Sequence, residues 1–309
     1  SLSKLIGNQL TETSVCSILD PGQVPEIRGV TRFPAQEHVG GDCKIPSVLY
    51  YDQDGKVRAV GAEAMREDIV AIKEDEEWVS TPWYVFSRCR VARFNMDLRF
   101  KLHLRPKTGV SNPNDVAGNV PPLPPNKTAL QVFSDFLKYL YECTRTYIEE
   151  THGFVATSDG AGSTWWNELE RDGLIDFVLT HPNGWEGAQQ ETMRRAAWLA
   201  GLVRSEEDAG SRISFVTEGE ASLHFCLHSG ISTDIMKVRI VIMWSEWGLT
   251  LLLGGNGVLV VDAGGGTVDM SAYAKADSED WYEEVAAPQC HFQGSIFVTF
   301  NARAFLDCE

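Results

Sequence analysis

Two aspartates, three consecutive glycines and a threonine lie within eight residues of one another in this chain. They form Asp262–Asp269 and follow an apolar run, Val258–Val261, that is typical of a buried strand. Glycine lets the backbone approach a ligand closely, so three in a row leave several N–H groups able to converge on an anion. An aspartate at the end of a strand can hold the metal ion that accompanies a polyphosphate. The segment predicts a nucleotide-phosphate site; the alternative is a plain glycine-rich hairpin turn.

Two further loops carry side chains that could act beside a phosphate. His181–Trp185 contains a proline-rigidified turn, and Thr217–Ser222 contains a pair of carboxylates. Glu218 is placed to orient or deprotonate a water in phosphoanhydride hydrolysis. The alternative is that Glu218 only complements the dipole of a helix that begins there. If these loops end strands of one sheet, they share a cleft with the glycine segment.

The elements that position these loops can be read from hydrophobic spacing. Apolar runs predict strands at 45–51, 56–60, 174–180 and 213–217. Helical spacing predicts helices from about 62, at 128–151, at 186–202 and at 218–228. Thr128 and Gln131 form a capping-box pair at the start of the longest helix. This alternation of strands and helices is typical of an α/β protein that binds ligands at the carboxyl ends of its strands.

Composition narrows the classes of partner. A chain of 309 residues can bury a sizeable core, and its net charge of −16 excludes a phosphate-backbone partner such as a nucleic acid. Seven cysteines without a C-x-x-C pair are typical of reduced thiols, so we expect a cytoplasmic protein. Its most apolar stretch, Val238–Leu253, contains Arg239 and Glu246 and is too short to span a bilayer, so no membrane partner is expected.

The quoted motifs together resemble a known family. Val261–Asp269 resembles the second phosphate loop of the heat shock protein 70 ATPase, within the actin and sugar-kinase superfamily. Glu218–Ser222 is similar to that family's Glu-Pro-Thr-Ala-Ala segment, and Pro182 matches the proline of its strand-end turn. Other similar landmarks are Ile45–Ser47, Gly61–Ala64 and Ala200–Leu202. The likeness is to the divergent fungal and animal branch that lacks a recognisable peptide-binding domain.

The resemblance implies roles for individual residues. In the family, the loop's amides and threonine contact the β- and γ-phosphates of the nucleotide, with Mg²⁺ nearby. The resemblance therefore implies ATP or ADP with Mg²⁺ as the cofactor. The resemblance implies catalytic roles for Glu218, Pro182 and Asp262, of which Asp262 is also the metal-side residue. It implies nucleotide binding by Gly264, Gly265, Gly266, Thr267 and Asp269. Lys101 is the candidate for the family's phosphate-facing lysine, although a solvated surface lysine is the better interpretation.

The sequence also departs from the family pattern. Residues 1–20 contain no Asp-x-Gly-Thr-Thr-x-Ser loop, and the adenosine-binding Gly-Gly-Ser segment is expected beyond Glu309. We therefore expect an actin-like, ribonuclease-H-like α/β fold with its first lobe largely present and its second lobe truncated. The expected organisation is an atypical segment 1–20, a first lobe 21–230 with a Pro-rich loop 105–127, an atypical insertion 231–257, and the start of the second lobe at 258–309.

More than one interpretation stays open for the insertion and for the function. Val238–Gly254 is interpreted as an edge strand, a partner-facing patch or the product of a faulty gene model. The leading hypothesis is an ATP-binding and ATP-hydrolysing module of reduced affinity, with protein clients or co-chaperones as partners. One alternative is a catalytically silent protein-interaction scaffold derived from such an ATPase. Another is a small-molecule kinase of the same superfamily.

Overall fold

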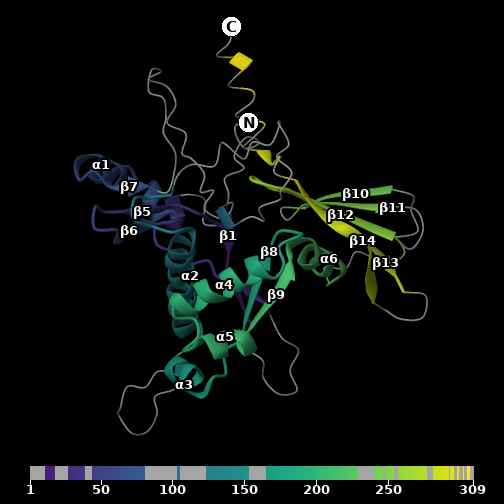
Figure 1. Ribbon diagram of the computed structural model, residues 1–309, viewed down its shortest axis with the longest axis horizontal. Helices are drawn as coiled ribbons and strands as arrows, with labels where there is room; N and C mark the ends of the chain where they lie inside the picture. Colours follow the sequence, from purple (N-terminus) through teal and green to yellow (C-terminus); the bar gives the residue numbers. More distant parts are fainter. Residues whose placement is uncertain are drawn as a thin grey trace. The chain divides into compact units, whose positions relative to one another are not determined.

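The computed structural model describes residues 11–17, 27–38, 44–80, 103–104, 123–152, 165–228, 240–245, 248–253, 257–276, 281–291, 293–295, 298, 302 and 305–306. These residues form a mixed α/β structure of small sheets and α-helices (Figure 1). They divide into two compact units. The N-terminal unit contains the described residues of Gln9–Phe177 and Glu191–Ile213, and the glycine-hairpin unit contains those of Val178–Gln190 and Ser214–Glu309.

Short strands and one long helix make up most of the N-terminal unit. β5 pairs with β6 and with β7, β1 pairs with β4, and β2 pairs with β3. Their bounds are β1 Thr11–Thr13, β2 Val15–Cys16, β3 Arg28–Gly29, β4 Lys44–Pro46, β5 Leu49–Tyr51, β6 Val57–Val60 and β7 Val79–Ser80. The helices are α1 Glu67–Asp75, α2 Ala129–His152, α3 Trp165–Asp172 and α5 Glu206–Arg212, with 3₁₀ turns at Gln36–His38 and Glu63–Met65. α4, Ala188–Leu199, begins in the glycine-hairpin unit and continues into this one.

The predicted strand over 45–51 is wrong in one respect, because it is two strands. The amide of Val48 donates to the carbonyl of Pro46 at 2.9 Å, and this tight turn separates β4 from β5. A hairpin turn follows β5: Asp52 accepts the amides of Asp54 and Lys56, and Gly55 has a φ of 77°. Helix α1 runs to Asp75, and Glu76 and Glu77 follow it in a turn.

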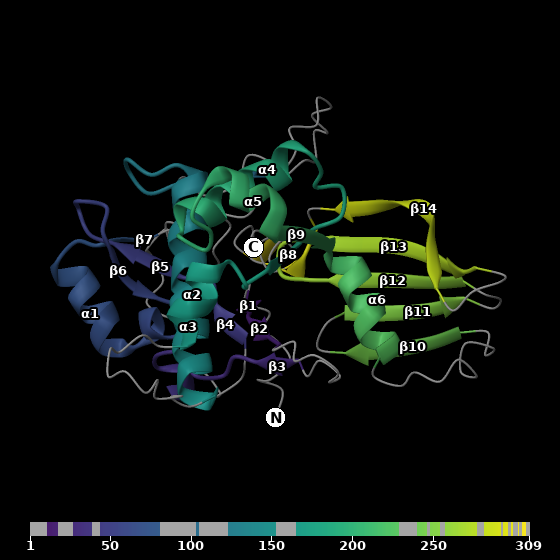
Figure 2. The ribbon, with the colours of Figure 1, turned by 90° about the horizontal axis from the view of Figure 1, so that it is seen from below.

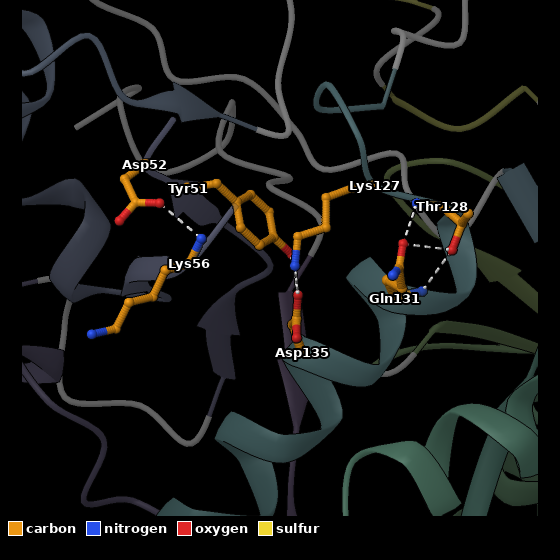
Figure 3. Close-up of polar contacts among 7 residues, drawn as sticks. All are labelled: Tyr51, Asp52, Lys56, Lys127, Thr128, Gln131 and Asp135. Carbon is orange, nitrogen blue, oxygen red and sulfur yellow. Dashed lines mark hydrogen bonds and ion pairs between the residues drawn. The ribbon is translucent and has the colours of Figure 1, made fainter. Parts of the chain in front are cut away.

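The longest helix begins where its capping box predicts. The amide of Gln131 donates to Oγ1 of Thr128 at 3.2 Å, and the amide of Thr128 donates to Oε1 of Gln131 at 2.9 Å. Figure 3 shows this cap beside a second polar cluster, in which Asp135 accepts from the hydroxyl of Tyr51 at 2.9 Å and from Nζ of Lys127 at 2.8 Å. Lys127 also lies 4.5 Å from the centre of the Tyr51 ring. These contacts fix the start of α2 against the strand β5.

Five antiparallel strands dominate the glycine-hairpin unit, and each pairs with its neighbours along the chain. They are β10 Ile240–Ser245, β11 Gly248–Leu253, β12 Gly257–Ala263, β13 Val268–Lys275 and β14 Tyr282–His291. Helix α6, Glu218–His228, lies against β12 and β13 (Figure 2). Alternate residues of the two strands, Val258, Val260 and Tyr273, pack with Leu223 and Cys226 of α6 to form the core.

The stretch Val238–Gly254 contains the hairpin of β10 and β11, and β10 lies at one end of the strand order, as the edge-strand interpretation expects. β8, Phe177–His181, and β9, Ile213–Thr217, form a separate two-stranded sheet and end close to the predicted positions. None of the described helices is both long enough and apolar enough to cross a membrane.

Candidate functional site

The glycine segment forms the tight turn of the β12–β13 hairpin. The amide of Gly264 donates to the carbonyl of Thr267 at 2.9 Å, and Gly265 and Gly266 occupy the tip. Asp262 faces Asp269 across the two strands. In its backbone path the segment is thus the hairpin turn that the sequence left as the alternative. Turn geometry alone does not separate the two interpretations.

The carbonyls of Gly264 and Gly266 face the same side of the turn. The amide of Ser295 donates to the carbonyl of Gly264 at 3.1 Å, and the amide of Gly294 donates to that of Gly266 at 3.3 Å. The peptide group of Gly265 lies side-on against Gly294, because an ideal Cβ on Gly294 would be 2.4 Å from its carbonyl oxygen and 2.5 Å from its carbonyl carbon. The segment Gln293–Ser295 therefore backs the hairpin on its carbonyl side.

Two N–H groups of the turn face the other way. No peptide bond of the described residues is cis, and in a trans peptide the N–H points opposite to the preceding carbonyl. The amides of Gly265 and Thr267 therefore point away from Gln293–Ser295. None of the backbone hydrogen bonds among the described residues uses the amides of Gly265, Gly266 or Thr267 as donors. N–H groups on one side of a turn are able to bind an anion.

Asn183 joins the proline turn to this hairpin. Its backbone amide donates to Oδ1 of Asp269 at 2.8 Å, and its side-chain Nδ2 donates to Oγ of Ser271 at 2.9 Å. Nδ2 also lies within hydrogen-bond distance of the carbonyls of Met270 and Gln289, at 3.2 and 3.4 Å. Asn183 and Asp269 are each 1% exposed. The buried side chains of the turn and of β13 thus form one polar network.

The network fills a defect in the β13–β14 ladder. Met270 pairs with Gln289, but the register shifts before Ala272 pairs with Ala286. Pro288 lies in this interval and has no N–H to give to the ladder. The Nδ2 group of Asn183 supplies donors to carbonyls on both strands at this point. Asn183 is not marked as a site residue by its type; its place between Pro182 and Gly184, in a turn that Trp185 closes, is its signal in the sequence.

The third loop predicted from the sequence reaches the same place. Thr217 caps α6 by accepting the amide of Glu220 at 3.1 Å, which sets Glu218 in the first turn. Glu218 is half-buried, and its charge raises the pKa of Asp269. Gly219 packs so closely on β13 that a Cβ there would be 2.2 Å from Oγ of Ser271. The three loops selected from the sequence therefore converge on Asp269.

Asp269 is a buried carboxylate whose pKa is raised above its ordinary value. Burial and then the charge of Glu218 raise its pKa, while Thr267, the Asn183 amide and Cys290 oppose this rise. Thr267 and Cys290 are near enough to act on its charge, but Oδ2 has no hydrogen-bond partner of acceptable geometry among the described residues. Asp269 lies in β13, and the hydrogen bond that it accepts from the Asn183 amide joins the proline turn to this strand.

Replacing Asp269 with asparagine should change how stability depends on pH. Because the pKa of Asp269 is raised on folding, the folded state holds this proton more tightly than the unfolded state does. The contribution of Asp269 to stability therefore falls as the pH rises from its ordinary pKa of 3.8 through the raised value. Asp269→Asn keeps an acceptor for Asn183 and removes this titration. Urea unfolding from pH 4 to pH 8 should show the variant gaining stability relative to the parent; a constant difference would contradict it.

Asp262 fits a magnesium site completed by phosphate oxygens and waters, but not a site made of protein ligands alone. No group of three or more His, Cys, Asp or Glu side chains among the described residues is arranged to hold a metal ion. An all-protein cage is therefore not formed by the described residues. Magnesium that accompanies a polyphosphate needs only one or two carboxylates, with phosphate oxygens and waters as its other ligands. Asp262, half-buried at the end of β12 and opposite Asp269, fits this second type.

The remaining predicted site residues are placed as follows. Pro182 is buried in the turn that precedes α4, and its carbonyl accepts the amide of Trp185 at 3.4 Å. Lys101 lies outside the described residues. Gly294 and Ser295 were not singled out from the sequence; a glycine shortly after the last strand was the only available signal. No model of a known protein family matches this chain, and no curated protein sequence is similar to it.

Proposed function

We propose that the glycine-hairpin unit binds the phosphates of ATP or ADP with Mg²⁺ and hydrolyses ATP, as an ATPase module resembling the nucleotide-binding domain of the heat shock protein 70 family. The actin-like ATPase fold belongs to the same proposal. One observation carries it: the amides of Gly265 and Thr267 point to the same side of the hairpin because the carbonyls before them accept from Ser295 and Gly294. This arrangement supports binding of an anion of several oxygens.

Each of the other loops has a role in this proposal. Bound magnesium would neutralise charge on the phosphate oxygens, and Asp262 would be its protein ligand. Glu218 would accept the proton of a water that attacks the terminal phosphorus, while the bond from that phosphorus to the leaving ADP oxygen breaks. Pro182 would keep the turn beside Asp269 rigid. The convergence of these loops on Asp269 supports their action at one site.

Calorimetric titration of the whole chain tests the proposal. Magnesium with inorganic tripolyphosphate, and then Mg-ATP, should give saturable heat in the millimolar range. Asp262→Asn should weaken the magnesium-dependent part by about tenfold, which corresponds to about 1.4 kcal/mol. A phosphate-release assay with the same samples should show turnover that falls in Glu218→Gln.

The control is Asp176→Asn, which changes an exposed carboxylate of the N-terminal unit. It should bind like the parent chain. Absence of heat for both ligands at concentrations of about 10 mM would overturn the proposal, since it would set the free energy of binding weaker than about −3 kcal/mol. That result would favour the protein-interaction scaffold.

A further inference from the structure

Gly294 touches the hairpin more closely than any side chain could. A Cβ on Gly294 would lie 2.4 Å from the carbonyl oxygen of Gly265, 2.5 Å from its carbonyl carbon and 2.7 Å from the carbonyl oxygen of Gly264. All three are backbone atoms, so no side-chain rotation relieves the overlap. The φ of Gly294 is not in the left-handed region. Its requirement for glycine is therefore steric, and the three nearest atoms all belong to the hairpin.

The same contact fixes the direction of the hairpin's amides. The amides of Gly294 and Ser295 hold the carbonyls of Gly266 and Gly264, and these two bonds bracket the Gly265 peptide, which lies against Gly294. An added methyl group at position 294 must push this peptide away or break both hydrogen bonds. Either movement turns the N–H groups of Gly265 and Thr267 out of their common direction.

We propose that Gly294 is a positioning residue for the phosphate site: it lets the Gln293–Ser295 segment lie flat against the hairpin, so that the N–H groups of Gly265 and Thr267 face a polyphosphate. The inference rests on the proposed function and assigns a determinant of it to a segment beyond β14. Gly294 touches no ligand and acts only through the hairpin backbone.

The test compares two glycine-to-alanine variants of the same unit. Gly294→Ala should lower the affinity for magnesium tripolyphosphate at least tenfold. Gly257→Ala is the matched control, because a Cβ there meets only the carbonyl oxygen of Tyr273 at an ordinary 3.8 Å, and it should bind like the parent chain. In ¹H–¹⁵N spectra, the amides of Gly265–Thr267 should shift in Gly294→Ala before any ligand is added. A purely structural role would lower the melting temperature without this selective shift.

The outcomes separate the two proposals. If the parent chain binds tripolyphosphate and Gly294→Ala binds equally well, the role of Gly294 is overturned and the proposed function stands. If the parent chain does not bind, the proposed function fails and the role of Gly294 fails with it. If Gly294→Ala does not fold, Ser295→Pro removes the donor to Gly264 without adding an atom at position 294. It should then lower the affinity for tripolyphosphate in the same way, and unchanged affinity would overturn the inference.

Discussion

Asn183→Ala is expected to lower the free energy of unfolding by about 2–4 kcal/mol, because it removes a buried donor that serves several acceptors at once. Nδ2 donates to Ser271 at 2.9 Å and lies 3.2 and 3.4 Å from the carbonyls of Met270 and Gln289. The alanine leaves these acceptors with one donor fewer in a place where Pro288 already withholds an N–H. Urea unfolding followed by circular dichroism measures the change.

Two companion variants separate the causes of this loss. Asn183→Asp keeps the shape of the side chain but cannot donate, and it puts a carboxylate beside buried Asp269; it should be at least as destabilising at neutral pH. Asn167→Ala makes the same substitution at an exposed residue of α3, whose Oδ1 accepts from Arg145 at 2.8 Å. It should change the free energy by less than about 0.5 kcal/mol. Equal effects of Asn183→Ala and Asn167→Ala would contradict the network described here.

Gly219→Ala is the second change with a large expected effect. Alanine normally stabilises a helix relative to glycine by about 1 kcal/mol, yet here we expect a loss of about 2–3 kcal/mol from overpacking. A Cβ on Gly219 would lie 2.2 Å from Oγ and 3.1 Å from Cβ of Ser271, and 3.4 Å from Oδ1 of Asn183. Moving the Ser271 hydroxyl also breaks its bond with Nδ2 of Asn183. The overlap and the network are therefore disturbed together.

A double-mutant cycle isolates the contact between α6 and β13. Ser271→Gly removes the two nearest atoms that the new methyl group would meet and leaves only Oδ1 of Asn183 at an ordinary 3.4 Å, so Gly219→Ala should become neutral or stabilising in that background. The coupling free energy between the two positions should be about 2–3 kcal/mol. Gly210→Ala in α5, where nothing lies within 4 Å of the new Cβ, is the matched helical control. A loss from Gly219→Ala that persists with Ser271→Gly would show that the packing is not its cause.

Much of the local structure could be predicted because it depends on residues close in sequence. The capping box of Thr128 and Gln131 places the start of α2 within one residue, and β9 and α6 have the predicted bounds. Both depend on short-range signals: hydrophobic spacing and a side chain that satisfies helix amides. Helices α3 and α5 were missed because they are short and polar, so their apolar spacing is weak.

Several residues of the candidate site could be selected from the sequence, but the contacts that join them could not. The sequence selected Glu218, Pro182 and the glycine segment by residue type, and the structure brings their loops together at Asp269. Asn183 and Gly294 could not be found in this way. Asn183 is important because it contacts β13, 86 residues away along the chain. Gly294 is important because it contacts the backbone of the hairpin, about 30 residues away. Neither contact leaves a local pattern in the sequence.

The strand order of the glycine-hairpin unit has a consequence for how the chain folds. β10 to β14 lie side by side in the order in which they occur in the sequence, so every pairing closes a short loop at low entropic cost. The bond from Asn183 to Asp269, in contrast, joins residues 86 positions apart. The meander can therefore assemble first, and the proline turn docks on a sheet that is already formed. In this order of events, loss of the Asn183 contacts accelerates unfolding far more than it slows folding.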